Sequence, residues 1–133
     1  EETRKCVSRW YARLFLVACH VTVGEVLIRE VPHLTEVIQA VACHHERFDG
    51  TGYPRALGGD AIPKIGRIIA IADSYSAMRL DRPYRKGMGQ DRVLNELVAG
   101  AGTQFDPDIV RVFVELLLEE EVLHGAERLR TAA

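Results

Sequence analysis

The chain has 133 residues, with 17 Lys and Arg against 19 Asp and Glu, so its formal net charge at pH 7 is −2. This length suits one domain with a real core, and 47% apolar with 27% charged residues excludes intrinsic disorder. The near-neutral charge argues against a protein that binds DNA or a membrane surface through bulk positive charge.

The surroundings in which the protein works can be inferred from its apolar runs and its cysteines. The run from Leu14 to Cys19 is too short to span a bilayer, and no secretory leader is recognisable. There are three cysteines, an odd number with no C-x-x-C pair, which argues against a disulfide framework. We therefore expect a cytoplasmic protein without a membrane segment.

Helical periodicity of the apolar residues runs through nearly the whole chain, and no convincing alternating strand interrupts it. The spacing predicts helices over residues 8–19, 20–31, 34–42, 63–78, 93–98 and 106–117. Glycines and Pro54 between residues 46 and 61 predict a long loop, which in a compact helical protein is usually functional. The sequence therefore predicts an all-α domain.

The last predicted helix has the clearest start signal. Asp106 suits the N-cap, Pro107 suits the first helical position, and Asp108 is favourable to the helix dipole. We expect this helix to fray after Leu117 into a charged tail over residues 119–133.

Polar residues lie on the apolar faces of three of the predicted helices. His20 lies on the face of Val23 and Leu27, His44 and His45 extend the face of the next helix, and Asp73 lies four residues after Ile69. A buried carboxylate needs a partner, and several imidazoles around one carboxylate are best reconciled by a cation. That ligand set suits Fe, Mn, Zn or Ni rather than Ca or Mg. The alternative is that each histidine is a hydrogen-bonded core residue.

A structural zinc site built from Cys19, His20, Cys43 and His44 is a second alternative. Adjacent residues on a helix point about 100° apart, so the four side chains cannot easily converge. Closed zinc sites usually space their ligands by two or more residues.

The loop after the paired histidines carries the most specific pattern. Residues 44–54 read H-H-E-R-F-D-G-T-G-Y-P, and this segment resembles the signature H-H-E-x-x-D-G-x-G-Y-P of the HD-GYP family of metal-dependent phosphohydrolases. Other segments match in order over about residues 20–118: H-V-T-V-G from His20, I-P at Ile62, I-A-D ending at Asp73, D-R-P-Y-R from Asp81 and G-x-x-F-D-P ending at Pro107.

The resemblance implies an HD-domain-like helical bundle that hydrolyses cyclic di-GMP to pGpG or GMP with a cluster of two or three Fe or Mn ions. It implies that the metal ligands are His20, His44, His45 and Asp73. It also implies that the substrate is contacted by Arg82 and Arg85, with Tyr53 in the loop beside the site. The arginines suit this role because a guanidinium can bind a phosphate in a bidentate manner.

The chain also departs from the family pattern. It contains no His-Asp dipeptide, Ser76 stands where the family has a second Asp, and residues 1–19 match no family segment. Because the chain begins with Glu1 rather than Met, we expect a partial HD-GYP domain over residues 20–118 that lacks its N-terminal ligands, preceded by an unmatched helix over residues 1–19.

A non-catalytic function is the alternative. A degenerate signalling module would bind cyclic di-GMP, or a partner such as a diguanylate cyclase domain, through the Gly-Tyr-Pro loop. An upstream sensory domain is expected as a further partner. Apolar surface left by missing helices would favour a homodimer.

Overall fold

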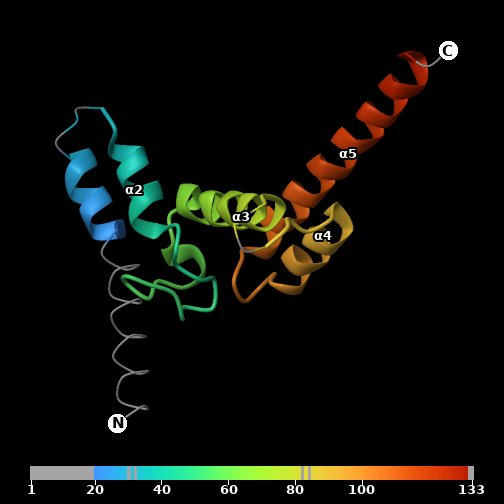
Figure 1. Ribbon diagram of the computed structural model, residues 1–133. Helices are drawn as coiled ribbons and strands as arrows, with labels where there is room; N and C mark the ends of the chain where they lie inside the picture. The colour runs from blue at the N-terminus through green and yellow to red at the C-terminus, as the bar shows by residue number, and fades with distance from the viewer. Residues whose placement is uncertain (1–19, 30, 32, 82, 84, 132–133) are drawn as a thin grey trace, which may run out of the picture. The chain divides into compact units, whose positions relative to one another are not determined.

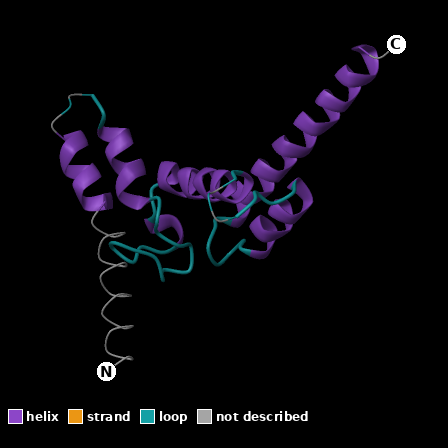
Figure 2. Ribbon diagram, viewed as in Figure 1, coloured by secondary structure: helices purple, strands orange, loops and turns teal. Residues whose placement is uncertain are grey.

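The computed structural model describes residues 20–29, 31, 33–81, 83 and 85–131. Its regular elements are a helix over residues 20–29, α2 (Thr35–Cys43), the short 3-10 helix η1 (Gly59–Ala61), α3 (Lys64–Arg79), α4 (Gln90–Ala99) and α5 (Pro107–Thr131) (Figure 1). No strand occurs in these ranges, so the predicted all-α fold is confirmed (Figure 2). The helix predicted over residues 8–19 lies outside them.

The chain divides into two compact units, residues 1–70 and 71–133, with α3 running from the first into the second. In the first unit the 20–29 helix and α2 lie side by side (Figure 1). They approach closely at Gly24, where an added Cβ would lie 3.0 Å from a methyl carbon of Val41. The first turns of α3 pack on α2 at Gly66, where a Cβ would lie 2.9 Å from that of Cys43. Small residues therefore set both helix contacts.

The predicted apolar faces of two helices are not the ones that the structure buries. In the 20–29 helix the buried residue is Val21, at 0% exposure, whereas Leu27 on the predicted face is 66% exposed. In α3 the buried apolar side chain is that of Ile71, whereas Asp73 is exposed. Both helices carry apolar residues on more than one side, so periodicity alone does not decide which side is covered.

The second unit has a continuous apolar core. Its fully or nearly buried members come from α3, α4, the loop after α4 and α5, and they are Ile71, Val93, Leu97, Phe105 and Val110. Gly100 lets the Phe105 ring pack against the end of α4, because a Cβ at Gly100 would lie 2.8 Å from that ring. The core thus joins three helices.

The start of α5 is capped as the sequence predicts. The Asp106 carboxylate accepts hydrogen bonds from the backbone N–H groups of Asp108 (2.9 Å) and Ile109 (3.3 Å), which the first helical turn would otherwise leave unpaired. The end of α5 differs from the prediction, since the helix continues to Thr131 instead of fraying after Leu117. The residues beyond Leu117 are mostly Leu, Glu, Ala and Arg, all good helix formers. None of the described helices is both long and apolar enough to cross a membrane.

Candidate metal centre

Three of the four predicted metal ligands come together in the first unit. His20 begins the 20–29 helix, and His44 and His45 directly follow α2. One possible ligand atom from each of the three side chains lies within 4.8 Å of the others, and among the described residues these three form the group suited to a metal ion. Two helices that pack side by side therefore bring distant histidines into one cluster.

The tautomer of His44 is fixed by a backbone contact. Its Nδ1 lies 2.8 Å from the carbonyl oxygen of Val41, one turn earlier. A carbonyl oxygen can only accept, so Nδ1 carries the proton and the lone pair of the ring is on Nε2. Metal-binding histidines usually make such a bond with the nitrogen that does not bind the metal.

The Nε2 atoms of His20 and His45 face each other at 3.2 Å. Two imidazoles on one tetrahedral ion, each with a metal–nitrogen bond of about 2.0–2.1 Å, would hold their nitrogens about 3.3 Å apart. This separation is that of a hydrogen bond between the two rings, and it also matches the spacing of two ligands of one ion. Neutral imidazoles suit Fe, Mn, Zn and Ni, so the chemistry of the donors fits a divalent transition metal.

The loop from residue 46 to residue 57 covers one side of this cluster. The ring of Tyr53 stacks on that of His45, with centroids 4.9 Å apart and planes 23° apart. The Tyr53 N–H donates to the His45 carbonyl oxygen at 3.2 Å. Burial raises the pKa of the Tyr53 phenol, so this group stays protonated at neutral pH. Tyr53, predicted to lie in the loop beside the site, thus contacts a candidate ligand directly.

At its exposed tip the same loop is closed by Asp49. The carboxylate accepts hydrogen bonds from the Arg47 guanidinium (2.9 Å) and from the hydroxyl (2.6 Å) and N–H (3.0 Å) of Thr51. These bonds hold the pKa of Asp49 well below its usual range.

Cys43 does not join the cluster. Its side chain is buried with Ala42 and Ile62 in the small core of the first unit, and burial raises the pKa of the thiol. A protonated thiol is a poor metal ligand, because the thiolate is the form that binds. This argues against the zinc alternative, whose remaining cysteine, Cys19, lies outside the described residues.

The other predicted site residues are found elsewhere. Asp73 lies on the part of α3 that belongs to the second unit, and its role as a ligand stays a prediction. Arg85 donates from its guanidinium to the Ala77 carbonyl oxygen at 3.1 Å, near the end of α3. Arg82 lies outside the described residues.

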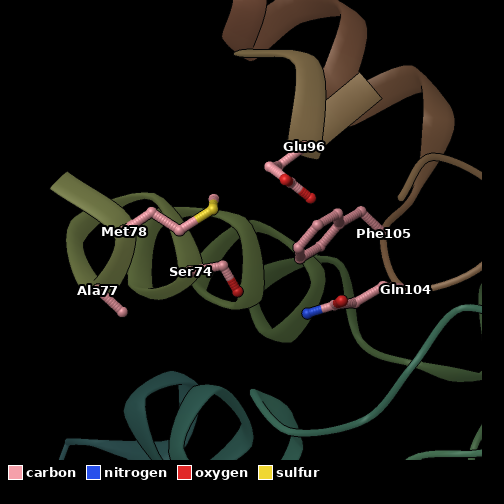
Figure 3. Close-up of a pocket in the computed structure, with 6 residues that line it drawn as sticks. All are labelled: Ser74, Ala77, Met78, Glu96, Gln104 and Phe105. Atoms are coloured by element: carbon pink, nitrogen blue, oxygen red, sulfur yellow. The ribbon is translucent and has the colours of Figure 1, made fainter. Parts of the chain in front are cut away.

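The second unit contains a separate pocket with a volume of about 250 Å³. Figure 3 shows α3 residues facing a side chain of α4 and the loop that precedes α5, and the lining consists of Ser74, Ala77, Met78, Glu96, Gln104 and Phe105. None of the predicted site residues that the structure describes is among them, although Gln104 and Phe105 belong to the G-x-x-F-D-P segment quoted above.

Sequence reasoning missed the residues that hold the loop beside the histidines. The Glu46 carboxylate accepts from the Arg55 N–H and so joins the start of the loop to its end, and the Arg55 guanidinium pairs with Glu25 of the 20–29 helix. The one available signal was Glu46, a carboxylate directly after two histidines and ahead of a glycine-rich loop. Arg55 and Glu25 carry no local signal, because they are far apart in the sequence.

Comparison with known proteins assigns the chain to a family. The HD domain family matches residues 11–109, which is most of the chain, so the chain belongs to this family. The family match begins at residue 11, upstream of His20, the first residue of the quoted motifs. The predicted limits of the partial domain, residues 20–118, stay a prediction. The resemblance to HD-GYP phosphohydrolases is confirmed by relatives of that type.

Two curated relatives and one solved structure illustrate the match. A cyclic di-GMP phosphodiesterase of Vibrio cholerae serotype O1 is 42% identical over 90 residues, covering 68% of this chain and 18% of that protein. The 3'3'-cGAMP-specific phosphodiesterase 2 of the same organism is 43% identical over 102 residues, covering 75% of this chain and 19% of that protein. The crystal structure of a cyclic GMP-AMP-specific phosphodiesterase of V. cholerae superposes with a TM-score of 0.65 at 30% identity, covering 78% of this chain and 23% of that one.

These matches confirm the HD-domain-like helical fold. They also show that the chain spans about a fifth of the length of these curated relatives.

Proposed function

We propose that this chain is the part of a metal-dependent phosphodiesterase that carries the metal-binding histidines, and that the substrate is cyclic di-GMP, hydrolysed to pGpG or GMP. The observation that carries the proposal is the convergence of His20, His44 and His45, with two facing Nε2 atoms at the separation expected for one ion. Membership of the HD domain family and relatives named as cyclic di-GMP phosphodiesterases support it.

The three imidazoles would hold a divalent ion, for which we propose Fe or Mn, in a centre of two or three ions when all ligands of the family are present. Such an ion supplies Lewis acidity toward a phosphodiester and activates water. We propose Asp73 as a further ligand, because a carboxylate balances metal charge.

The remaining residues of the proposed site bind and orient. The His44 Nδ1–H bond to Val41 keeps that ring in one orientation, and the protonated Tyr53 phenol can donate a hydrogen bond at the edge of the cluster. We propose that Arg82 and Arg85 bind the phosphates. Arg85 would then exchange its bond to the neutral Ala77 carbonyl for a bidentate ion pair with phosphate, in which both partners are charged.

A second substrate is favoured by the names of two matched proteins. One curated relative and the solved structure are named for 3'3'-cGAMP or cyclic GMP-AMP, which shares the phosphodiester ring of cyclic di-GMP and differs in one base. The alternative of a non-catalytic module is less favoured, since the relatives considered are named as phosphodiesterases. A sensory domain, a diguanylate cyclase domain and a second copy of the chain remain proposed partners.

The activity test uses a polypeptide that contains this chain together with the remaining family ligands, loaded with Mn²⁺ or Fe²⁺ and, in separate reactions, cyclic di-GMP and 3'3'-cGAMP. We expect release of pGpG or GMP from cyclic di-GMP, resolved by chromatography, and loss of that release in His45→Ala. His124→Ala, a change at an exposed histidine of α5, serves as the matched control with unchanged turnover. Tight substrate binding without product, by a chain that holds metal, would instead support the non-catalytic module.

A further inference from the structure

We propose that Glu46 is a positioning residue: its buried carboxylate fixes the 46–57 loop so that the loop holds His45 and His20 in one cluster. The inference deepens the proposed function and rests on it in one respect, namely that the cluster binds metal. The geometry on which it stands lies entirely within the first unit.

The first step is the carboxylate itself. Glu46 is only 3% exposed, yet both of its oxygens are paired, one with the Arg55 N–H at 2.7 Å and the other with the Leu57 N–H at 3.0 Å. A buried carboxylate is costly unless it is hydrogen-bonded, and bonds to a charged acceptor are stronger than neutral ones. The far end of the loop is thereby tied to the residue that directly follows His45.

The second step is the side chain of Arg55. Its guanidinium nitrogen Nη2 lies 3.0 Å from each carboxylate oxygen of Glu25. Glu25 belongs to the same helix as His20, and its side chain is 15% exposed. The residue whose backbone is held by Glu46 therefore holds the helix that carries His20.

The third step is the backbone between these anchors. An added Cβ at Gly52 would lie 2.3 Å from the Arg47 nitrogen and 2.6 Å from the Glu46 Cα, so the loop folds directly against its own start. The next residue, Tyr53, stacks on His45 and donates its N–H to the His45 carbonyl. The loop thus contacts one histidine through an aromatic ring and the helix of another through an ion pair, and Glu46 fixes both contacts.

The first readout needs no metal. The Tyr53 ring should shift the His45 ring-proton resonances upfield in the NMR spectrum of the metal-free 133-residue chain. We expect Glu46→Ala to move these resonances toward their values in an unstructured peptide. The second readout is Co²⁺ affinity, followed by visible absorption, which Glu46→Ala should weaken by about 10-fold to 100-fold.

A second variant tests the inference if Glu46→Ala unfolds, as a loss of its helical circular-dichroism signal would show. Arg55→Ala keeps the backbone N–H that Glu46 binds and removes only the exposed guanidinium, so the fold should survive. We expect it to shift the His20 ring resonances and to weaken Co²⁺ binding by about 3-fold. Arg29→Ala is the matched control, because Arg29 also pairs with Glu25 but within the same helix, at 2.8 Å.

The two readouts separate the inference from the proposed function. If Glu46→Ala and Arg55→Ala both leave the histidine resonances and the Co²⁺ affinity where Arg29→Ala leaves them, the positioning role is wrong. If the unmodified chain binds no Co²⁺, the metal site fails, while the metal-free resonances still decide whether Glu46 positions the histidines.

Discussion

The two units of this protein differ in the kind of contact that stabilises each of them internally. In the first, directional polar contacts surround the histidines: a buried carboxylate on two backbone N–H groups, an ion pair between loop and helix, and a ring stacked on an imidazole. In the second, apolar side chains from α3, α4 and α5 fill one core. Apolar burial is non-directional, whereas hydrogen bonds fix positions.

This difference predicts which property a substitution in each unit should change. A ligand cluster requires specific orientations of a few rings, so the first unit uses contacts that set orientation. Among the described residues the second unit has the larger apolar core, and apolar burial there should contribute the larger share of their unfolding free energy. Changes in the second unit should therefore lower stability, and changes around the loop should lower metal affinity.

The largest expected effect on stability is in the core of the second unit. Leu97 is fully buried, so Leu97→Ala removes buried methyl groups and leaves a cavity, which should cost about 2–5 kcal/mol of unfolding free energy in denaturant titration. Val98→Ala on the same helix is the control, because Val98 is 57% exposed and should change stability by less than about 0.5 kcal/mol. Equal losses from the two variants would contradict the assigned core.

A smaller loss is expected at the cap of α5. Asp106→Ala removes the acceptor for two backbone N–H groups and should cost about 1 kcal/mol. Urea denaturation followed by circular dichroism measures it, with the exposed Glu115→Ala as the control. A result indistinguishable from that control would mean that the cap does not stabilise the helix.

The smallest effect is expected at the loop tip, and it depends on pH. Because the pKa of Asp49 is lowered in the folded state, its carboxylate stabilises the fold at neutral pH, and this contribution declines as the pH falls below the ordinary Asp value of about 3.9. The difference in melting temperature between the unmodified chain and Asp49→Asn should therefore be small at pH 7 and shrink toward pH 3. A difference that grew on acidification would have the wrong sign.

The sequence predicted local features well and long-range ones poorly. The Asp106 cap and the helix starts depend on neighbouring residues, and the paired histidines stand beside a recognisable loop pattern. The exposure of Asp73 was not predictable, because α3 is apolar on more than one side. The pairing of Arg55 with Glu25 joins residues 30 positions apart, and no local pattern encodes it.

The central claim is that three histidines of the first unit bind one divalent metal ion, and a Co²⁺ titration followed by visible absorption tests it most directly. We predict one ion per chain with the absorption of imidazole ligation. His20→Ala, His44→Ala and His45→Ala should each weaken binding by more than about 10-fold, while the exposed His124→Ala, on α5, should leave it unchanged. Binding that all three cluster variants leave intact, or no binding by the unmodified chain, would contradict the claim.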